Sequence, residues 1–94
     1  MNKSELIRNL ATERGISIDE ATDIVTIFFD SMKDALKNGE RVEIRGFGSF
    51  KIKDYKGYQG RNPKTGQVVS VGPKKLPFFR AGKELKDYLN SSQP

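Results

Sequence analysis

The sequence predicts an α+β fold, with two helices first, antiparallel strands next and a short helix at the end. Apolar residues recur at helical spacing through residues 1–40, and polar and apolar residues alternate through 41–53 and again through 76–81. Residues 54–75 are too polar to form a core, which predicts a segment that projects from the body. With a short helical segment at 82–90, these patterns indicate one small domain.

Each of the two long helices has sequence signals at both ends. Asn2 is placed to cap the first helix, and Gly15 to end it in the left-handed conformation. Ser17 and Glu20 fit the S-x-x-E capping box of the second helix, and Gly39 ends it. The apolar stripe of the second helix is wide enough to be buried on two sides: Ala21, Ile24, Val25, Ile27, Phe28, Phe29, Met32, Ala35 and Leu36.

Two helices joined by a short turn are also the frame of a helix-turn-helix DNA reader. The second helix does not suit that role, because its acidic side chains outnumber Lys33 and Lys37 and would repel phosphate. We therefore interpret the helical pair as scaffold.

A turn flanked by glycines joins the first two predicted strands. Residues 41–45 and 49–53 each alternate polar and apolar side chains, and Gly46-Phe47-Gly48 lies between them. A large aromatic residue at a tight turn is rarely left in open water. We expect Phe47 to be covered either by a partner chain or by its own core.

The polar segment 54–75 is either a long irregular loop or a two-stranded ribbon. Alternation at Val69 and Val71, with a tip that contains Pro and Gly near the midpoint, favours the ribbon. Such a ribbon would reach about 30 Å, enough to lie along a duplex. From Lys51 to Lys75 the net charge is +6, and we expect the ribbon to stay mobile until an anion orders it.

The return strand and the last helix complete the predicted body. Pro77 suits an edge strand or the start of a strand. In the last helix, Leu85 and Leu89 are the inward positions, and residues 90–94 are a frayed tail. Two lysines face outward, as phosphate contacts or as ordinary solvated charges: Lys83 and Lys86.

Composition argues against the commonest catalytic and metal sites. The chain has no histidine and no cysteine, so an enzyme is a poor first guess, and we expect neither a metal nor a cofactor. No apolar run approaches the roughly 20 residues of a membrane helix, and the N-terminus lacks an apolar signal-peptide core. We expect a soluble cytoplasmic protein that does not bind membranes.

Charge is divided unevenly along the chain. Residues 1–40 carry a net charge of −3 and residues 41–94 carry +8. This asymmetry indicates a polyanion partner, most often nucleic acid, with an acidic membrane surface as the lesser candidate. The segment 60–66 would be ordinary punctuation between strands if it stood alone, but on a basic ribbon it is a candidate contact site.

Three motifs occur in the order and spacing of a known family. They are Ile44-Arg45-Gly46-Phe47-Gly48-Ser49-Phe50, Gly60-Arg61-Asn62-Pro63-Lys64-Thr65-Gly66 and Pro77-Phe78-Phe79-Arg80-Ala81-Gly82-Lys83-Glu84-Leu85. With the element order, they resemble the HU and integration host factor family of bacterial DNA-bending proteins. The resemblance implies a single non-enzymatic domain, residues 1–94, that binds and bends double-stranded DNA and organises the nucleoid with little sequence preference.

The resemblance also assigns the parts of the chain within an intertwined dimer. Residues 1–40 would form a helical dimerisation base, 41–53 and 76–81 a three-stranded antiparallel saddle sheet, 54–75 a β-ribbon arm and 82–90 the C-terminal helix. The dimer core that we expect is aromatic: Phe28, Phe29, Phe47, Phe50 and Phe79.

Pro63 at the arm tip is implied to wedge between base pairs from the minor groove. Proline is rigid, apolar and without an N–H, so it replaces a stacking contact without leaving a donor unpaired. Arg61 and Asn62 would hydrogen-bond the groove acceptors, while Gly60 and Gly66 let the chain reverse. The other expected DNA contacts are Lys3, Arg45, Lys53, Lys56, Lys64, Lys74, Lys75, Arg80, Lys83 and Lys86.

The chain departs from the family pattern in its arm. Tyr55 and Tyr58 stand where many members carry arginine, and residues 67–72 of the return strand hold no basic residue. We expect weaker arm electrostatics and a shallower salt dependence of binding, unless the tyrosines pack against sugars.

Glu43 and Arg45 resemble a pair in the beta subunit of integration host factor that is linked to sequence preference. A plain exposed salt bridge is the alternative interpretation. A site-preferring protein of that kind is a heterodimer with a related chain, whereas an HU-like homodimer needs no second sequence. RNA binding stays open, because an arm that tracks phosphates distinguishes the two backbones poorly. An interaction module that binds protein or an anionic surface through exposed valines and tyrosines is the alternative from another class.

Overall fold

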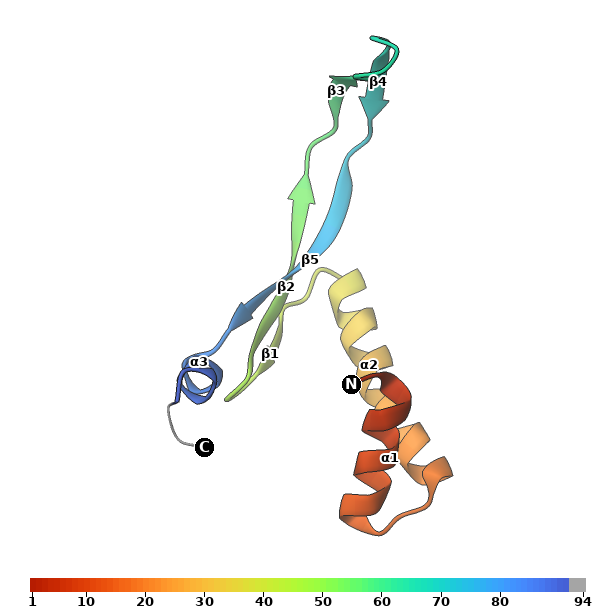
Figure 1. The fold of residues 1–94 in the computed structure, drawn as a ribbon, viewed down its shortest axis with the longest axis vertical. Coiled ribbons are helices and arrows are strands. Elements are labelled where there is room, and N and C mark those ends of the chain that lie inside the picture. Colours follow the sequence, from red (N-terminus) through yellow and green to blue (C-terminus); the bar gives the residue numbers. More distant parts are fainter. Residues whose placement is uncertain (92–94) are drawn as a thin grey trace. The chain divides into compact units, whose positions relative to one another are not determined.

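The computed structural model describes residues 1–91 and divides into two compact units. The first unit, residues 1–35, holds α1 (Lys3–Arg14) and most of α2 (Ile18–Lys37). The second unit begins at Leu36 and holds five strands and α3 (Lys83–Leu89) (Figure 1). Of the predicted tail, residues 92–94 lie outside the described residues.

The predicted caps of the two long helices are confirmed. The Glu5 N–H donates to Asn2 Oδ1 at 2.9 Å. The Glu20 N–H donates to Ser17 Oγ at 3.0 Å, and the Ser17 hydroxyl donates to Glu20 Oε1 at 3.2 Å. These bonds satisfy N–H groups that the first turn of a helix leaves without partners. Positive φ values mark the predicted ends of both helices: Gly15 (+62°) and Gly39 (+78°).

Small side chains form the buried core of the helical unit. Ala11 of α1 is buried, as are Ala21 and Val25 of α2. Most of the remaining apolar stripe of α2 is exposed in the single chain: Ile24, Ile27, Phe28 and Phe29. Within the helical unit, α1 therefore covers only one side of α2.

The second unit is built on a three-stranded antiparallel sheet in the order β1-β2-β5. Its strands are β1 (Val42–Ile44), β2 (Gly48–Tyr55) and β5 (Lys74–Ala81), so β2 and β5 extend further toward the arm than predicted. Pro77 lies on β5, which is an edge strand of this sheet, as its missing N–H predicts.

Two glycines shape the turn between β1 and β2. Gly46 has a φ of +86°, and the Phe47 N–H donates to Ile44 O at 2.9 Å across the turn. Gly48 is buried, and a Cβ there would lie 2.7 Å from the Phe79 ring. Glycine therefore lets the turn pack directly onto Phe79 of β5.

The predicted ribbon is confirmed. The strands β3 (Tyr58–Arg61) and β4 (Val68–Val71) pair antiparallel, β2 leads into β3, and β4 leads into β5 (Figure 1). Tyr55 is opposite Lys74 and Tyr58 is opposite Val71, with two unpaired residues in each strand between these pairs. The register is thus the same on both sides of the break, and the four strands form one long hairpin.

The last helix is slightly shorter than predicted. Gly82 and Asn90 cap α3 at its two ends, where the prediction had them inside the helix. Leu85 is half-buried, but Leu89 is 69% exposed. The prediction that Leu89 faces inward is therefore wrong within the single chain, because no other described element covers the end of this short helix.

Candidate nucleic-acid interface

The sheet has one apolar face and one basic face. Phe50 is opposite Phe79 and their ring centroids lie 4.8 Å apart, whereas the next pair along the strands is Lys51 opposite Phe78. Successive side chains of a strand point to opposite faces, so these two pairs lie on different sides of the sheet. The second side, which we call the basic face, carries Ser49, Lys51, Lys53, Tyr55, Lys74, Leu76, Phe78 and Arg80.

A shallow depression in the basic face is lined by donors and one aromatic ring. Its lining residues are Arg41, Ser49, Lys51, Phe78 and Arg80, with no carboxylate among them. Glu43 is opposite Ser49 and pairs with Arg41 at the rim, so Lys51 and Arg80 are the lining cations without an ion pair among the described residues. Cations that outnumber the nearby carboxylates produce a positive potential that attracts anions. This part of the sheet is therefore suited to a phosphate group.

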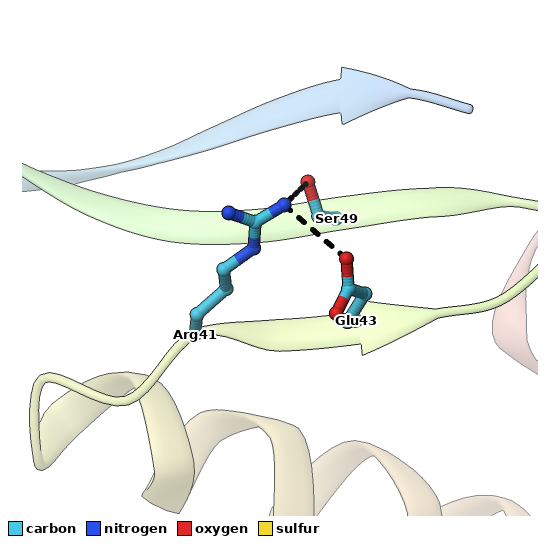
Figure 2. A network of polar contacts seen from close by, with 3 residues as sticks. All are labelled: Arg41, Glu43 and Ser49. Carbon is cyan, nitrogen blue, oxygen red and sulfur yellow. Dashed lines mark hydrogen bonds and ion pairs between the residues drawn. The ribbon is translucent and has the colours of Figure 1, made fainter. Parts of the chain in front are cut away.

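An ion pair next to the depression involves a different arginine from the one that the sequence suggested. Arg41 is the residue immediately before β1, and Figure 2 shows its side chain extending toward Glu43 and Ser49. Arg41 Nη2 lies 3.3 Å from Glu43 Oε1 and 3.4 Å from Ser49 Oγ. Within residues 1–91 no ion pair joins Glu43 to Arg45, which instead lines a neighbouring depression beside Glu43 and Arg80. The plain salt bridge considered for Glu43 and Arg45 is therefore absent.

Internal hydrogen bonds close the arm tip around Pro63. The Asn62 N–H donates to Gln67 O at 2.8 Å, and the Gly66 N–H donates to Asn62 O at 2.7 Å. The Lys64 N–H donates to Asn62 Oδ1 at 2.9 Å. Pro63 is exposed within this closed loop. These three hydrogen bonds hold closed the loop that carries Pro63.

The two glycines predicted to reverse the chain at the tip have different roles. Gly66 has a φ of +74°, which suits the reversal. Gly60 lies within β3, opposite Val69, and its φ is not positive. The prediction for Gly60 is wrong, because the turn begins only after β3 has ended at Arg61.

The remaining predicted cations are spread over both units. Lys75 lies on the face opposite the basic face, with its Nζ 3.7 Å from Asp54 Oδ1, and Lys83 Nζ lies 2.7 Å from Asp87 Oδ2. Both ion pairs are exposed, so each holds its lysine only weakly. Lys56 lines a depression at the base of the arm together with Lys74 and Lys75. The other cations are exposed at separate places: Lys3 in α1, Lys64 in the arm and Lys86 in α3.

Sequence reasoning missed three residues of the basic face as site candidates. Lys51 was available from its alternation with Lys53 in the same strand. Arg41 and Phe78 carried no such signal, because their positions beside the depression depend on which residues of β1, β2 and β5 are paired.

The described residues hold neither a cluster of metal ligands nor a helix that could span a membrane. Between residues 1 and 91, no three His, Cys, Asp or Glu side chains gather where they could hold a metal ion. In the same part of the chain, no helix is long and apolar enough to cross a membrane.

The basic face, the long hairpin and its proline-bearing tip define a nucleic-acid-binding protein of the β-ribbon class. The chain belongs to the family of bacterial DNA-binding proteins, that of HU and integration host factor, whose family model, described as bacterial DNA-binding protein, matches residues 1–90. This is a family of architectural DNA-binding proteins, not of enzymes.

Curated relatives come from both branches of the family. The chain is 47% identical over 91 residues to integration host factor subunit beta of Histophilus somni (strain 2336), covering 96% of this chain and 97% of the relative. It is 42% identical over 87 residues to DNA-binding protein HU 1 of Bacillus subtilis (strain 168), covering 93% and 95%.

Solved structures of HU proteins share the fold. A cocrystal structure of Anabaena HU with DNA matches with a TM-score of 0.85 and 31% identity, covering 96% of this chain and 98% of that one. The V42I mutant of HU from Thermotoga maritima matches with a TM-score of 0.71 and 29% identity, covering 96% and 100%.

Proposed function

We propose that this protein is a non-enzymatic architectural protein of the nucleoid that binds duplex DNA and bends it with little sequence preference. The observation that carries the proposal is the continuous hairpin that joins the basic face of the sheet to a closed, proline-bearing tip. The sheet would hold the DNA backbone, and the arm would reach into the minor groove.

The basic face is the part of the body that we assign to the phosphates. Its cations are Lys51, Lys53, Lys74 and Arg80, with Arg41 at the rim of the depression. Contacts to phosphates release counterions, so affinity should fall as salt rises, with a slope of about 0.9 in log–log terms for each phosphate neutralised. The further contacts that we assign are Lys3, Arg45, Lys56, Lys64, Lys75, Lys83 and Lys86.

The tip supplies the bend. Pro63 is exposed on a loop that its own hydrogen bonds hold closed, so inserting it between base pairs requires little ordering of the protein. Unstacking a step costs on the order of a few kcal/mol, which the additional backbone contacts of bent DNA offset. Arg61 and the Nδ2 amide of Asn62 would donate to the groove acceptors beside the wedge.

A dimer of two copies of the chain would place two tips on one DNA. Large apolar side chains are exposed in both units of the single chain: Phe28 and Phe29 in α2, and Phe47 and Phe79 in the second unit. Apolar surface of this extent is typical of an interface. We assign it, together with Phe50, to the dimer core.

The test is a titration of the protein into labelled duplex DNA, followed by anisotropy over a salt series. We expect binding at low salt, and a slope that falls by about 1.8 for each chain that contacts the DNA when Lys53 and Lys74 are both replaced by glutamine. Replacing Lys33 and Lys37 of α2 by glutamine removes the same charge from another surface and should leave the slope unchanged.

Failure of the parent protein to bind DNA at low salt would refute the proposal and favour the protein-interaction module. A matched RNA duplex, titrated in parallel, shows whether the same surface also accepts RNA.

A second candidate function is site-preferring bending, which the network at Glu43 favours. Glu43 lies 3.3 Å from Arg41 and lines a depression with Arg45 at the edge of the sheet, so its carboxylate would orient the Arg41 guanidinium beside the DNA. This protein would then act with a related partner chain. A binding-site selection experiment tests it: equal affinity for selected and scrambled DNA at physiological salt rules the preference out.

A further inference from the structure

Phe78 lies at the centre of the basic face, on the side of the sheet away from the proposed dimer core. A role in that core therefore does not explain why an aromatic residue is there. Its neighbour Phe79 points to the apolar face and packs on Phe50, whereas Phe78 is opposite Lys51 on the other side of the sheet. Its side chain stays 38% exposed. A large aromatic residue in this position gains little from burial within the sheet.

Two lysines lie close to the Phe78 ring. The Nζ of Lys53 lies 3.7 Å from the ring centroid, and the Nζ of Lys51 lies 5.9 Å from it. An ammonium over a ring face is attracted by the ring quadrupole. Lys53 is only half-exposed, which is consistent with its side chain lying along the ring.

Phe78 also lines the depression that contains Arg41, Ser49 and Arg80. Phe78 thus joins the depression to Lys53. The Phe78 ring does not block the depression. It also leaves the Lys53 ammonium able to donate hydrogen bonds, because an ammonium over a ring still directs N–H groups to solvent.

We propose that Phe78 is a positioning residue for DNA binding, which fixes the Lys53 ammonium and the edge of the Arg41–Arg80 depression where backbone phosphates arrive. The inference rests on the proposed function. A free lysine loses much rotamer freedom when it binds a phosphate, and the ring reduces that loss by restricting Lys53 beforehand.

Loss of the Phe78 ring should lower the affinity for DNA without changing the number of phosphates that the protein contacts. Phe78→Leu keeps an apolar side chain and every charge, but it removes the ring. We expect it to weaken DNA binding by about two- to fivefold for each sheet that contacts DNA, with the salt slope unchanged. Phe78→Tyr keeps the ring and should bind like the parent.

A double-mutant cycle separates positioning from general damage to the sheet. Lys53→Gln should lower the salt slope by about 0.9 for each sheet that contacts DNA. Combined with Phe78→Leu, it should show coupling, because the ring acts through Lys53. Lys51→Gln is the matched control, since its longer distance to the ring predicts weaker coupling with Phe78.

A proton NMR spectrum of the free protein provides a readout that needs no DNA. The ring should shift the Lys53 Hε resonances upfield, and Phe78→Leu should abolish that shift. If the parent binds DNA and Phe78→Leu binds equally tightly, the positioning role is refuted. If the parent binds no DNA, the proposed function fails, whatever the NMR shift shows.

Discussion

At the scale of single residues, Asn62 connects the fold of the arm tip to its proposed contact with DNA. Its Oδ1 accepts from the Lys64 N–H, and its backbone N–H and C=O bond to Gln67 and Gly66. The sequence suggested only a groove contact for this side chain. The structure adds a turn-forming role, because an Asn oxygen that accepts from the backbone two residues on stabilises a tight turn.

Two substitutions separate these roles of Asn62. Asn62→Ala removes both, and we expect faster exchange of the Lys64 amide in the free protein together with weaker DNA binding. The lost bond is worth about 0.5–1.5 kcal/mol. Asn62→Ser keeps an acceptor without the amide donor, so it should partly restore the slow exchange. Hydrogen exchange followed by NMR is the measurement, and unchanged Lys64 exchange in Asn62→Ala would contradict the turn-forming role.

Residue roles that depend on local signals were predictable, and those that depend on register were not. The caps at Asn2 and Ser17 follow from spacing within one turn of helix and are present in the structure. Phe78 gains its role from the pairing of β2 with β5, which are far apart in the chain, and Arg41 gains its role from the pairing of β1 with β2. Alternation identifies the two faces of each strand, but it does not identify the neighbour that each side chain meets.

At the scale of elements, the arm depends on a close crossing of its two strands at the break in pairing. A Cβ on Gly57 would lie 2.7 Å from Val71 O, so only glycine fits beside the other backbone. Pro73, on the opposite strand of the same break, has no N–H to donate to the ladder. Gly57 and Pro73 therefore account for the break in strand pairing, and the pairing register is the same on its far side.

Gly57→Ala should loosen the ribbon beyond the break. The added methyl group forces the backbones apart, at a cost of about 1–3 kcal/mol. We expect faster amide exchange in β3 and β4 and reduced DNA bending, with the pairing of β2 and β5 retained. Gly72→Ala is the matched control, since a Cβ there meets nothing within 4 Å and its φ is not positive. Equal exchange rates in the two variants would disprove the crossing as the determinant of arm structure.

The elements themselves were largely readable from the sequence. Periodicity gave the helices, alternation gave the sheet strands, and Pro77 indicated the edge strand. The end of β2 was predicted two residues too early and the start of β5 two residues too late, because Asp54, Tyr55, Lys74 and Lys75 are polar or aromatic residues that extend the pairing without adding to the core. Leu89 was misassigned because an apolar residue at the end of a short helix can stay exposed in one chain.

At the scale of the whole molecule, the apolar surface exceeds what one chain covers. Phe47 settles on Phe79 with ring centroids 5.5 Å apart, yet it remains 45% exposed. Both explanations expected for Phe47 therefore apply in part. Its own sheet covers one side of the ring, and the other side is available to a partner chain. The dimer proposed above would bury this side.

Sedimentation and chemical unfolding test the dimer. We expect the parent to sediment as two chains, with an unfolding midpoint that rises with protein concentration. Phe79→Ala should destabilise the dimer by about 3–5 kcal/mol, the usual range for a core aromatic. Tyr88→Ala, at an exposed position of α3, should have no such effect. A monomeric parent with a concentration-independent midpoint would exclude the dimer.

Bending of DNA by the closed tip through Pro63 can be measured by end-to-end FRET on a doubly labelled duplex. We expect saturating parent protein to bring the two ends of the duplex together. Pro63→Ala should still bind through the basic face, but it should leave the duplex markedly straighter. If Pro63→Ala at saturation gives the same end-to-end distance as the parent, the wedge mechanism is wrong.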